Sequence, residues 1–233
     1  MRALADLGCG SGELTRELKK RWPHSQVWGI DSSAEMLACA AALPGQAQLS
    51  FVRADLREWR PERPLDLIVS NAALHWVPDH ALVLEHLARL LAPGGVLAVQ
   101  IPNNQAEASH RILAELCQEE PWARRLRDVQ GPQPLAGAAW YLEQLLGLGL
   151  EAEVWETIYY HELPAASAIV DWLKGTALRP VLAALSQADA RAFEAALEGR
   201  MARASAWERA ARIGLRVVPF SQSTIALAAG SSW

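Results

Sequence analysis

Cysteine, positive charge and long apolar runs are scarce in this chain of 233 residues, and each scarcity excludes a class of protein. The three cysteines, Cys9, Cys39 and Cys117, are odd in number, and none of their spacings is typical of a metal-binding pair. We therefore expect no disulfide framework, no metal site and a reducing cytoplasm as the setting. The sequence has no run of about 18 apolar residues and no recognisable secretory signal, so we expect no membrane partner.

Positive charge is also limited. Lysine and arginine together number 22 against 26 aspartates and glutamates, which gives a formal net charge of -4. A nucleic-acid partner would require a basic face, so we expect none. Apolar residues make up 51% of the chain, which is enough for a sizeable core. The length fits one domain, or one domain with a cap, and we expect a monomer.

The chain does have a glycine-rich segment close to its start, ADLGCGSG over residues 5–12. An apolar run leads to Asp6, then Gly8, Gly10 and Gly12 alternate, and a helical pattern begins at Glu13. Glycines at a turn from strand to helix let the backbone approach a ligand where a Cβ would clash. A second acidic residue, Asp31, ends the next apolar strand, and the pair predicts a site for a nucleotide or nucleoside cofactor.

The spacing of the glycines distinguishes between cofactors. The dinucleotide fingerprint has the form G-x-G-x-x-G, and counting from Gly8 its third glycine would be residue 13, which is Glu13. Because acids flank the loop, a pyrophosphate is disfavoured and a cationic nucleoside such as S-adenosylmethionine is favoured. A nicotinamide oxidoreductase is one alternative, and a tight turn in an ordinary α/β protein is another.

The first half of the chain alternates between strand and helix patterns, which predicts a doubly wound, Rossmann-like α/β sheet with parallel strands. The expected strands are 2–7, 26–30, 49–53, 65–70 and 96–101. The expected helices are 13–22, 33–43, with Ser32 as its cap, and 79–91. The glycine loop, Asp31, Asp55 and Asn71 all follow strand ends, so they should converge on one edge of the sheet.

The second half is richer in helix. Helices are expected over 106–126, 138–146, 165–173 and 179–202, and strands over 151–161 and 215–229, the last broken near Pro219. We expect residues 1–160 to form the cofactor-binding core and 161–205 a helical cap, inserted in the C-terminal half, over the cofactor site. Residues 206–233 would return to the core as its last strand and a tail.

Several segments resemble the class I S-adenosylmethionine-dependent methyltransferases. Three mark this superfamily, at 6–12, 29–37 and 53–56. Three more are similar to a narrower family, the bacterial trans-aconitate 2-methyltransferases, and these are SNAALHWVPD (70–79), GGVLAVQIPN (94–103) and IVDWLKGTALRP (169–180). The resemblance implies a seven-stranded sheet with an antiparallel last strand. It also implies methylation of a carboxylate of a small polycarboxylic acid, with S-adenosylhomocysteine as the other product.

On this resemblance the cofactor would be held from several loops. The three glycines would approach its methionine portion, and Asp6 would order the turn or face the ammonium group through water. Asp31 would accept hydrogen bonds from the ribose hydroxyls, or would cap the helix after it. Asp55 would accept from the adenine amino group with the Leu56 backbone beside it, or would cap its own turn. Asn71 would meet the sulfonium end.

The acceptor side follows from the chemistry of a carboxylate, which is already ionised at neutral pH. No general base is then required, and catalysis consists of positioning and desolvation. His75 and Trp76 would be positioning residues near the methyl group, with a structural role for His75 as the alternative. Arg179 is the expected fork for a substrate carboxylate. Neutral donors would be Gln100, Asn103 and Tyr159, whereas Lys174 and His161 are expected to be solvent-exposed.

Family members usually begin further upstream, with helices that fold over the cofactor. In this sequence Met1 comes immediately before the first strand. The alternative function is therefore a protein of methyltransferase fold that binds the cofactor weakly or not at all because this lid is missing. A methyltransferase acting on another small-molecule acceptor is a further alternative.

Overall fold

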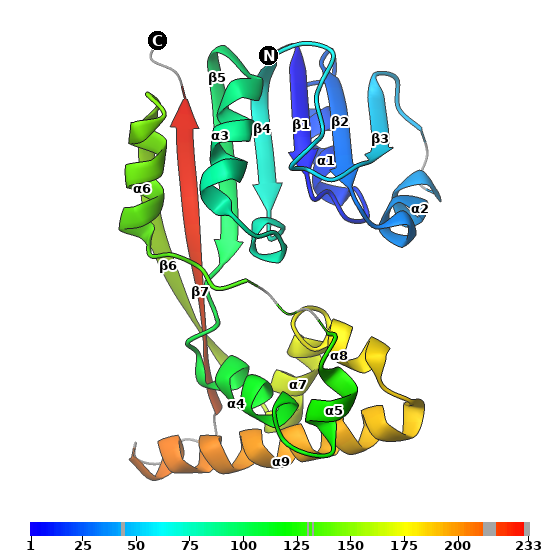
Figure 1. Cartoon of the computed structure of the whole chain (residues 1–233), viewed down its shortest axis with the longest axis vertical. Coiled ribbons are helices and arrows are strands. Elements are labelled where there is room, and N and C mark those ends of the chain that lie inside the picture. Colours follow the sequence, from blue (N-terminus) through cyan, green and yellow to red (C-terminus); the bar gives the residue numbers. More distant parts are fainter. Residues whose placement is uncertain (43–44, 130, 132, 212–217, 231–233) are drawn as a thin grey trace. The chain divides into compact units, whose positions relative to one another are not determined.

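In the computed structural model, residues 1–42, 45–129, 131, 133–211 and 218–230 are described, and they form a seven-stranded sheet of order β3-β2-β1-β4-β5-β7-β6 (Figure 1). Its strands are β1 (Ala3–Leu7), β2 (Gln26–Asp31), β3 (Leu49–Arg53), β4 (Leu65–Asn71), β5 (Leu91–Pro102), β6 (Glu151–Leu163) and β7 (Val218–Gly230). The first five strands pair in parallel, and β7 runs antiparallel to β5. The expected doubly wound sheet with an antiparallel last strand is confirmed.

Both faces of the sheet are covered. All five residues of β1 are buried, as is typical of a central parallel strand. Alternate residues of this strand point to opposite faces: Leu7 joins the core beneath α3 (His80–Leu90) and α6 (Ala138–Gly147), whereas Leu4 packs with Leu18 of α1 (Glu13–Arg21). In Figure 1, α3 lies in front of β4 and β5, and α1 lies behind β1 and β2.

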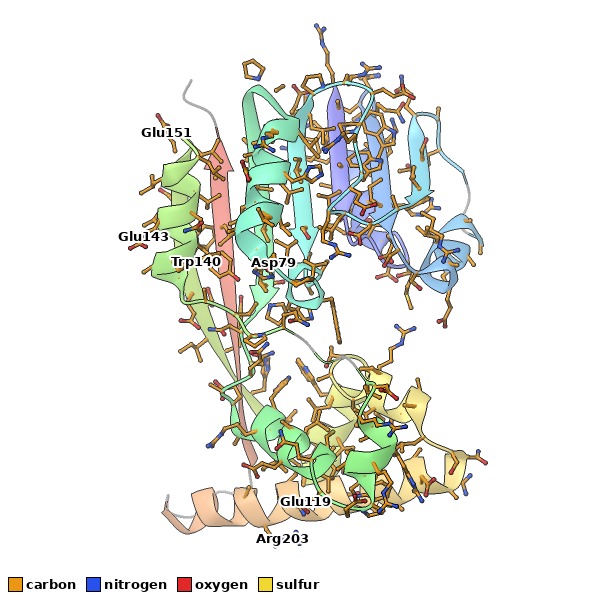
Figure 2. The ribbon with its side chains drawn as sticks, in the orientation of Figure 1. Asp79, Glu119, Trp140, Glu143, Glu151 and Arg203 are labelled. Atoms are coloured by element: carbon orange, nitrogen blue, oxygen red, sulfur yellow. The ribbon has the colours of Figure 1, made fainter. Side chains whose placement is uncertain are left out.

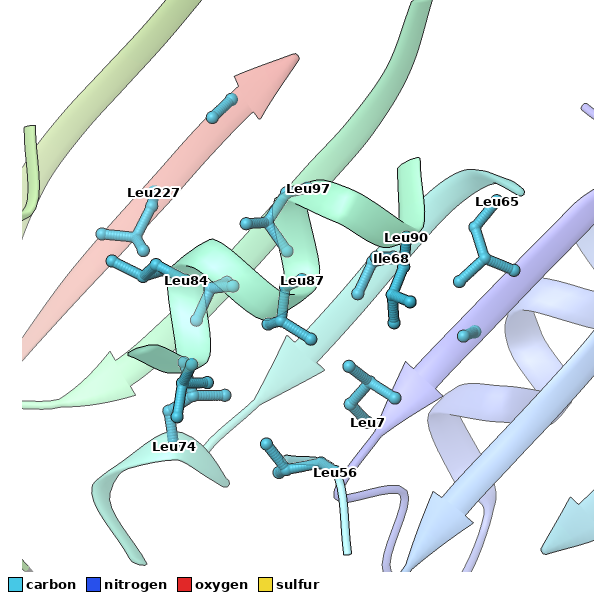
Figure 3. Packing of buried hydrophobic residues seen from close by; sticks show 14 of the residues in the cluster. Leu7, Leu56, Leu65, Ile68, Leu74, Leu84, Leu87, Leu90, Leu97 and Leu227 are labelled. Atoms are coloured by element: carbon cyan, nitrogen blue, oxygen red, sulfur yellow. The ribbon is translucent and has the colours of Figure 1, made fainter. Parts of the chain in front are cut away.

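The core beneath α3 also anchors two loops. Leu84, Leu87 and Leu90 recur at helical spacing on one face of α3 and pack over the strands (Figure 3). Leu56, from the loop after β3, and Leu74, from the loop after β4, belong to the same buried cluster (Figure 3). Burying one such leucine contributes about 1.5–3 kcal/mol, so both loops are tied to the sheet by apolar packing.

The chain divides into two units, which are described separately. The first, the sheet unit, contains residues 1–102, 135–157 and 224–233, and the second, the helical unit, contains 103–134 and 158–223. The helices of the second unit are α4 (Ala108–Cys117), α5 (Trp122–Leu126), α7 (Ala166–Lys174), α8 (Arg179–Ala184) and α9 (Gln187–Ala211). Its own apolar cluster contains Phe193, Leu197, Leu113 and Leu173. Within the described ranges, no helix has the length and apolar character needed to span a membrane.

The boundaries differ from the expected ones in several places. The helix expected over 106–126 is interrupted before Pro121, giving α4 and α5. The helix expected over 179–202 is also two helices, because Ser186 accepts a hydrogen bond from the Asp189 amide and begins α9. Residues 103–134, expected in the core, group with the helical unit, since Leu113 packs in the cluster of Phe193. Pro219 lies within a single strand, β7, rather than at a break, and residues 215–217 lie outside the described ones. That the helical unit caps the cofactor site stays a prediction.

Candidate functional site

The carboxyl ends of β1 and β4 define the candidate site. The chain leaves β1 towards β2 and β3 on one side and then returns to form β4 on the other side of β1. This change of direction is the topological switch point, where ligands of open parallel sheets bind. The glycine loop follows β1, and the loop after β4 contains a short 3-10 turn, η1 (Leu74–Trp76). The two loops with the clearest sequence signals are therefore neighbours.

Glycine is required at the three loop positions for different structural reasons. All have positive φ angles: +75° at Gly8, +54° at Gly10 and +79° at Gly12. A Cβ on Gly8 would lie 2.1 Å from the Cβ of Ala73, and one on Gly12 would lie 2.6 Å from the Phe51 ring. A Cβ on Gly10 would meet no heavy atom of the described residues within 4 Å. Packing against protein explains Gly8 and Gly12, and Gly10 borders open space that a ligand could fill.

Asp31 joins the glycine loop to the next helix. Its Oδ2 accepts a hydrogen bond from the Gly10 amide at 2.8 Å, and its Oδ1 accepts from the Ser33 amide at 2.8 Å. Because each carboxylate oxygen accepts more than one hydrogen bond, the half-buried group can still bind ribose hydroxyls. Ser33 Oγ accepts from the Met36 amide at 3.2 Å, so Ser33 rather than the predicted Ser32 caps α2 (Ala34–Ala42).

Asp6 is buried beneath the same loop. Its Oδ2 accepts a hydrogen bond from Thr15 Oγ1 at 2.6 Å, which ties the end of β1 to the first turns of α1. Burial raises the pKa of Asp6 to about 6, the Thr15 hydrogen bond opposes this rise and the Asp31 charge adds to it. Of its two predicted roles, ordering the turn is visible in these contacts. The two carboxylates make the loop a better neighbour for a cation than for a phosphate.

Asp55 is engaged by its own turn. Its carboxylate accepts from the Arg57 amide at 2.9 Å and forms an ion pair with the Arg57 guanidinium, which lowers the pKa of Asp55. Its carbonyl accepts from the Trp59 amide at 2.9 Å. These contacts match the capping alternative, and contact with adenine stays a prediction. Leu56 is buried in the core, so its backbone is fixed beside Asp55.

The loop after β4 places one ring inward and one outward. Asn71 ends β4 with an exposed side chain and is paired in register with Gln100 of β5. His75 is buried, whereas Trp76 is 41% exposed, and their ring centroids are 5.0 Å apart. The sheet thus brings Asn71 and Gln100 together at the edge where η1 begins.

Sequence reasoning missed two histidines on α3. His80 Nε2 lies 2.9 Å from the Leu74 carbonyl oxygen, and its Nδ1 lies 2.5 Å from the hydroxyl of Tyr141 on α6. His86 Nε2 lies 3.0 Å from the Trp59 carbonyl oxygen, with Arg60 on its other nitrogen. Their position on the helix that follows the loop after β4 could have marked them as candidates. Their partners could not be predicted, because they come from segments distant in the sequence.

The remaining predicted residues belong to the helical unit or border it. Tyr159, on β6, is exposed and stacks on His161, whose ring centroid lies 5.1 Å from that of Trp172. Arg179 is exposed at the first residue of α8, and Asn103 is the first residue of the helical unit.

Two of these expectations need correction. His161 is half-buried rather than exposed, because it lies in the aromatic group of Tyr159 and Trp172. Lys174 is also half-buried, and its Nζ lies 3.0 Å from Asp171 and 2.9 Å from Glu194. Lys174 is therefore held by two carboxylates of its own unit.

Comparisons with known proteins identify the family and the fold. Residues 4–95 match the family described as a methyltransferase domain. A trans-aconitate 2-methyltransferase of Azoarcus sp. is 47% identical over 196 residues, which is 84% of this chain and 76% of that protein. One of Streptomyces avermitilis is 48% identical over 197 residues, covering 82% and 73%. A solved putative methyltransferase of Bacillus halodurans has a TM-score of 0.62 at 14% identity, over 97% of this chain and 91% of that one, and shares the fold.

Proposed function

Because this chain belongs to the family of the trans-aconitate 2-methyltransferases, we propose that it esterifies a carboxylate of a small polycarboxylic acid such as trans-aconitate, with S-adenosylmethionine as methyl donor. The observation that carries the proposal is the hydrogen bond from Gly10 to Asp31 at the switch point, beside open space. This pair offers a backbone without a side chain next to a carboxylate that accepts hydroxyl hydrogen bonds.

The cofactor side needs binding groups only. Bound S-adenosylmethionine supplies a sulfonium methyl group, whose transfer to a carboxylate oxygen yields an ester and S-adenosylhomocysteine. Asp31 would accept from the ribose hydroxyls, and the backbone at Gly10 would lie against the methionine portion. Asp6, beneath the loop, would favour the ammonium group. Asp55 with Leu56 would border the adenine, and Asn71 the sulfonium end.

The acceptor side needs orientation rather than a base, since a carboxylate is ionised at neutral pH. Trp76, exposed on η1, would exclude water from the methyl group, and His75 would hold η1 in place from beneath. Arg179 would bind a second carboxylate of the substrate through two parallel hydrogen bonds. Gln100, Asn103 and Tyr159 would donate further hydrogen bonds. Holding one oxygen in line with the methyl group is the main catalytic contribution.

Gly10→Ala tests the cofactor site. The new Cβ would meet no described atom within 4 Å, so the positive φ adds strain but no clash, and the fold should persist while the methyl group occupies the ligand's space. Gly149→Ala is a matched control, because Gly149 also has a positive φ, +76°, with no described atom within 4 Å of its Cβ. We expect isothermal titration with S-adenosylhomocysteine to show affinity reduced at least about tenfold for Gly10→Ala and unchanged for Gly149→Ala.

The titration also has outcomes that would contradict the proposal. Equal affinities for the two glycine variants would remove the site from this loop. A wild-type chain that binds neither S-adenosylmethionine nor S-adenosylhomocysteine would favour the non-catalytic alternative. Binding of a nicotinamide dinucleotide instead would favour the oxidoreductase.

Arg179 tests the acceptor class. Removing a charged fork costs about 1.5–3 kcal/mol, so we expect Arg179→Ala to raise KM for trans-aconitate about tenfold to a hundredfold, with S-adenosylhomocysteine affinity unchanged. Arg179→Lys should recover part of this loss, since it retains the charge without the fork. The exposed Arg111 of α4 gives a control in Arg111→Ala. Equal turnover of acids with one and with three carboxylates would contradict this role.

A small-molecule substrate is the partner that this function requires. We expect a monomer in the cytoplasm that binds no nucleic acid, the last because the net charge is -4. Light scattering of the purified chain tests whether it is a monomer. A shift assay with DNA and RNA at low salt tests whether it binds nucleic acid. A dimer or a salt-sensitive nucleic-acid complex would contradict these expectations.

A further inference from the structure

Helix α3 contacts two loops of the proposed site through histidine rings. Each ring uses both nitrogens: Nε2 faces a loop carbonyl, that of Leu74 for His80 and that of Trp59 for His86. The Nδ1 atoms face the Tyr141 hydroxyl and the Arg60 guanidinium, respectively. Since a carbonyl oxygen has no proton, Nε2 is the donor in both rings.

The Nδ1 partner fixes the tautomer of His86, and the Nδ1 partner of His80 fits the same tautomer. A guanidinium has donors only, so His86 Nδ1 accepts from Arg60 Nη1 at 2.9 Å. Tyr141 is fully buried, and burial raises the pKa of its hydroxyl to about 12, so it retains its proton and can donate to His80 Nδ1 at 2.5 Å. Each ring therefore links a partner on one side to a loop carbonyl on the other.

The two carbonyls belong to opposite ends of the proposed nucleoside site. Leu74 begins η1, and its carbonyl also accepts from the Val77 amide at 3.0 Å, so it fixes the turn that carries Trp76. Trp59 closes the turn that starts at Asp55, through its amide, and its ring packs 6.2 Å from that of Trp28. Figure 2 labels Asp79, just before α3, and Trp140, the neighbour of Tyr141 on α6.

We propose that His80 and His86 are positioning residues, of which His80 sets the methyl-end turn η1 and His86 sets the adenine-end turn of residues 55–59. This inference rests on the proposed function for which turn lies at the methyl end and which at the adenine end. The contacts of His80 with Leu74 and of His86 with Trp59, called the two braces below, do not depend on it. Because the two braces hold different turns, their loss should change different kinetic quantities. His80 should affect kcat, and His86 should affect cofactor affinity.

Matched amide variants isolate the donor. A glutamine amide nitrogen can take the place of Nε2, whereas an asparagine amide can take only that of Nδ1, and both side chains are polar and uncharged. His80→Gln should therefore retain near-normal turnover, and His80→Asn should lower kcat about tenfold to a hundredfold with unchanged affinity for S-adenosylhomocysteine. His86→Asn should weaken that affinity about tenfold with little change in kcat at saturating cofactor, and His86→Gln should rescue it.

Hydrogen exchange measured by mass spectrometry tests the braces without any activity. His80→Asn should raise exchange in residues 73–77 and leave 55–59 unchanged, and His86→Asn should do the reverse. Leu82→Ala, at a 65% exposed position of α3, should change neither segment. Because Tyr141→Phe retains the His80 ring and loses only its partner, it should show a weaker form of the His80→Asn effect.

The outcomes separate this inference from the proposed function. If both loops loosen equally in either variant, or if Gln and Asn behave alike, the braces are overturned. If His80→Asn and His86→Asn raise exchange in different turns but do not differ in their effects on kcat and affinity, the positioning role is overturned while the methyltransferase activity stands. If the wild-type chain transfers no methyl group, the proposed function fails, and the exchange pattern still decides whether the two braces exist.

Discussion

The sheet unit and the helical unit hold their proposed functional residues in opposite ways. In the sheet unit the backbone itself is constrained: Gly8 packs against Ala73, and Asp31 joins Gly10 to Ser33. In the helical unit, Arg179 and Tyr159 are exposed side chains on a framework centred on Phe193. A proposed cofactor site built from backbone is therefore restricted residue by residue, whereas a proposed substrate site built from side chains can change with few consequences for the fold.

Phe193→Ala tests whether the two units depend on each other. The side chain is fully buried and lies edge-on to the Trp122 ring at 5.3 Å, so truncation should lower the free energy of unfolding by about 3–5 kcal/mol. Every residue proposed to bind the cofactor lies in the sheet unit, so S-adenosylhomocysteine affinity should change less than about threefold. Denaturant unfolding and titration measure the two quantities, and a cofactor affinity lost together with stability would show that the cofactor site depends on the helical unit.

Gly8→Ala tests whether packing, rather than ligand approach, requires glycine there. Its Cβ would clash with the Ala73 Cβ, and the positive φ adds strain, so we expect a loss of about 3 kcal/mol in unfolding free energy. Ala73→Gly removes the opposing atom, and the double variant should recover the part of the loss due to the clash. A double variant no more stable than Gly8→Ala would show that the Gly8–Ala73 contact is not the cause.

Asp6→Asn separates the two roles of Asp6. The pKa of Asp6 is raised from 3.8 to about 6 in the folded chain, so its contribution to stability is fully present below pH 3.8 and lost as the pH rises through about 6. An asparagine still accepts from Thr15 and does not titrate. The variant should therefore be more stable than wild type at pH 7.5 by about 2 kcal/mol, with a smaller difference at pH 4.

Two measurements check the Asp6 prediction. Thermal unfolding between pH 4 and 7.5 measures the stability difference, and a variant less stable at every pH would contradict it. Titration with S-adenosylmethionine asks about the second role. Affinity reduced about tenfold would indicate that the Asp6 charge favours the ammonium group, and unchanged affinity would limit Asp6 to ordering the turn.

Much of the sheet could be predicted because its signals are local. Strands such as β3 and helices such as α1 match the expected ranges within a residue, since apolar periodicity and turn residues mark their ends. The division into units was less accessible. Residues 103–134 group with Phe193 through long-range packing, which no local pattern reports.

The site divides in the same way. Gly10 and Asp31 could be found from spacing, because few residue types other than glycine adopt a positive φ and few can replace a carboxylate at a strand end. The packing roles of Gly8 and Gly12 could not be distinguished from the role of Gly10. The distinction depends on Ala73 and Phe51, which come from other strands and loops. His80 and His86 were missed for the same reason: their partners, Tyr141 and Trp59, are fixed only by the fold.

The smallest expected effect concerns the helix that follows Asp31. Ser33 Oγ accepts from the Met36 amide, so Ser33→Ala should cost about 1 kcal/mol in unfolding free energy, whereas Ser32→Ala should cost almost nothing. Because the Ser33 amide also donates to Asp31, which holds Gly10, the variant asks whether the cap matters for the cofactor. Alanine retains that amide, so S-adenosylhomocysteine affinity should be unchanged in both variants. Weaker binding by Ser33→Ala would mean that the Asp31 position depends on the α2 cap, and the sheet unit would then be less rigid than its backbone contacts imply.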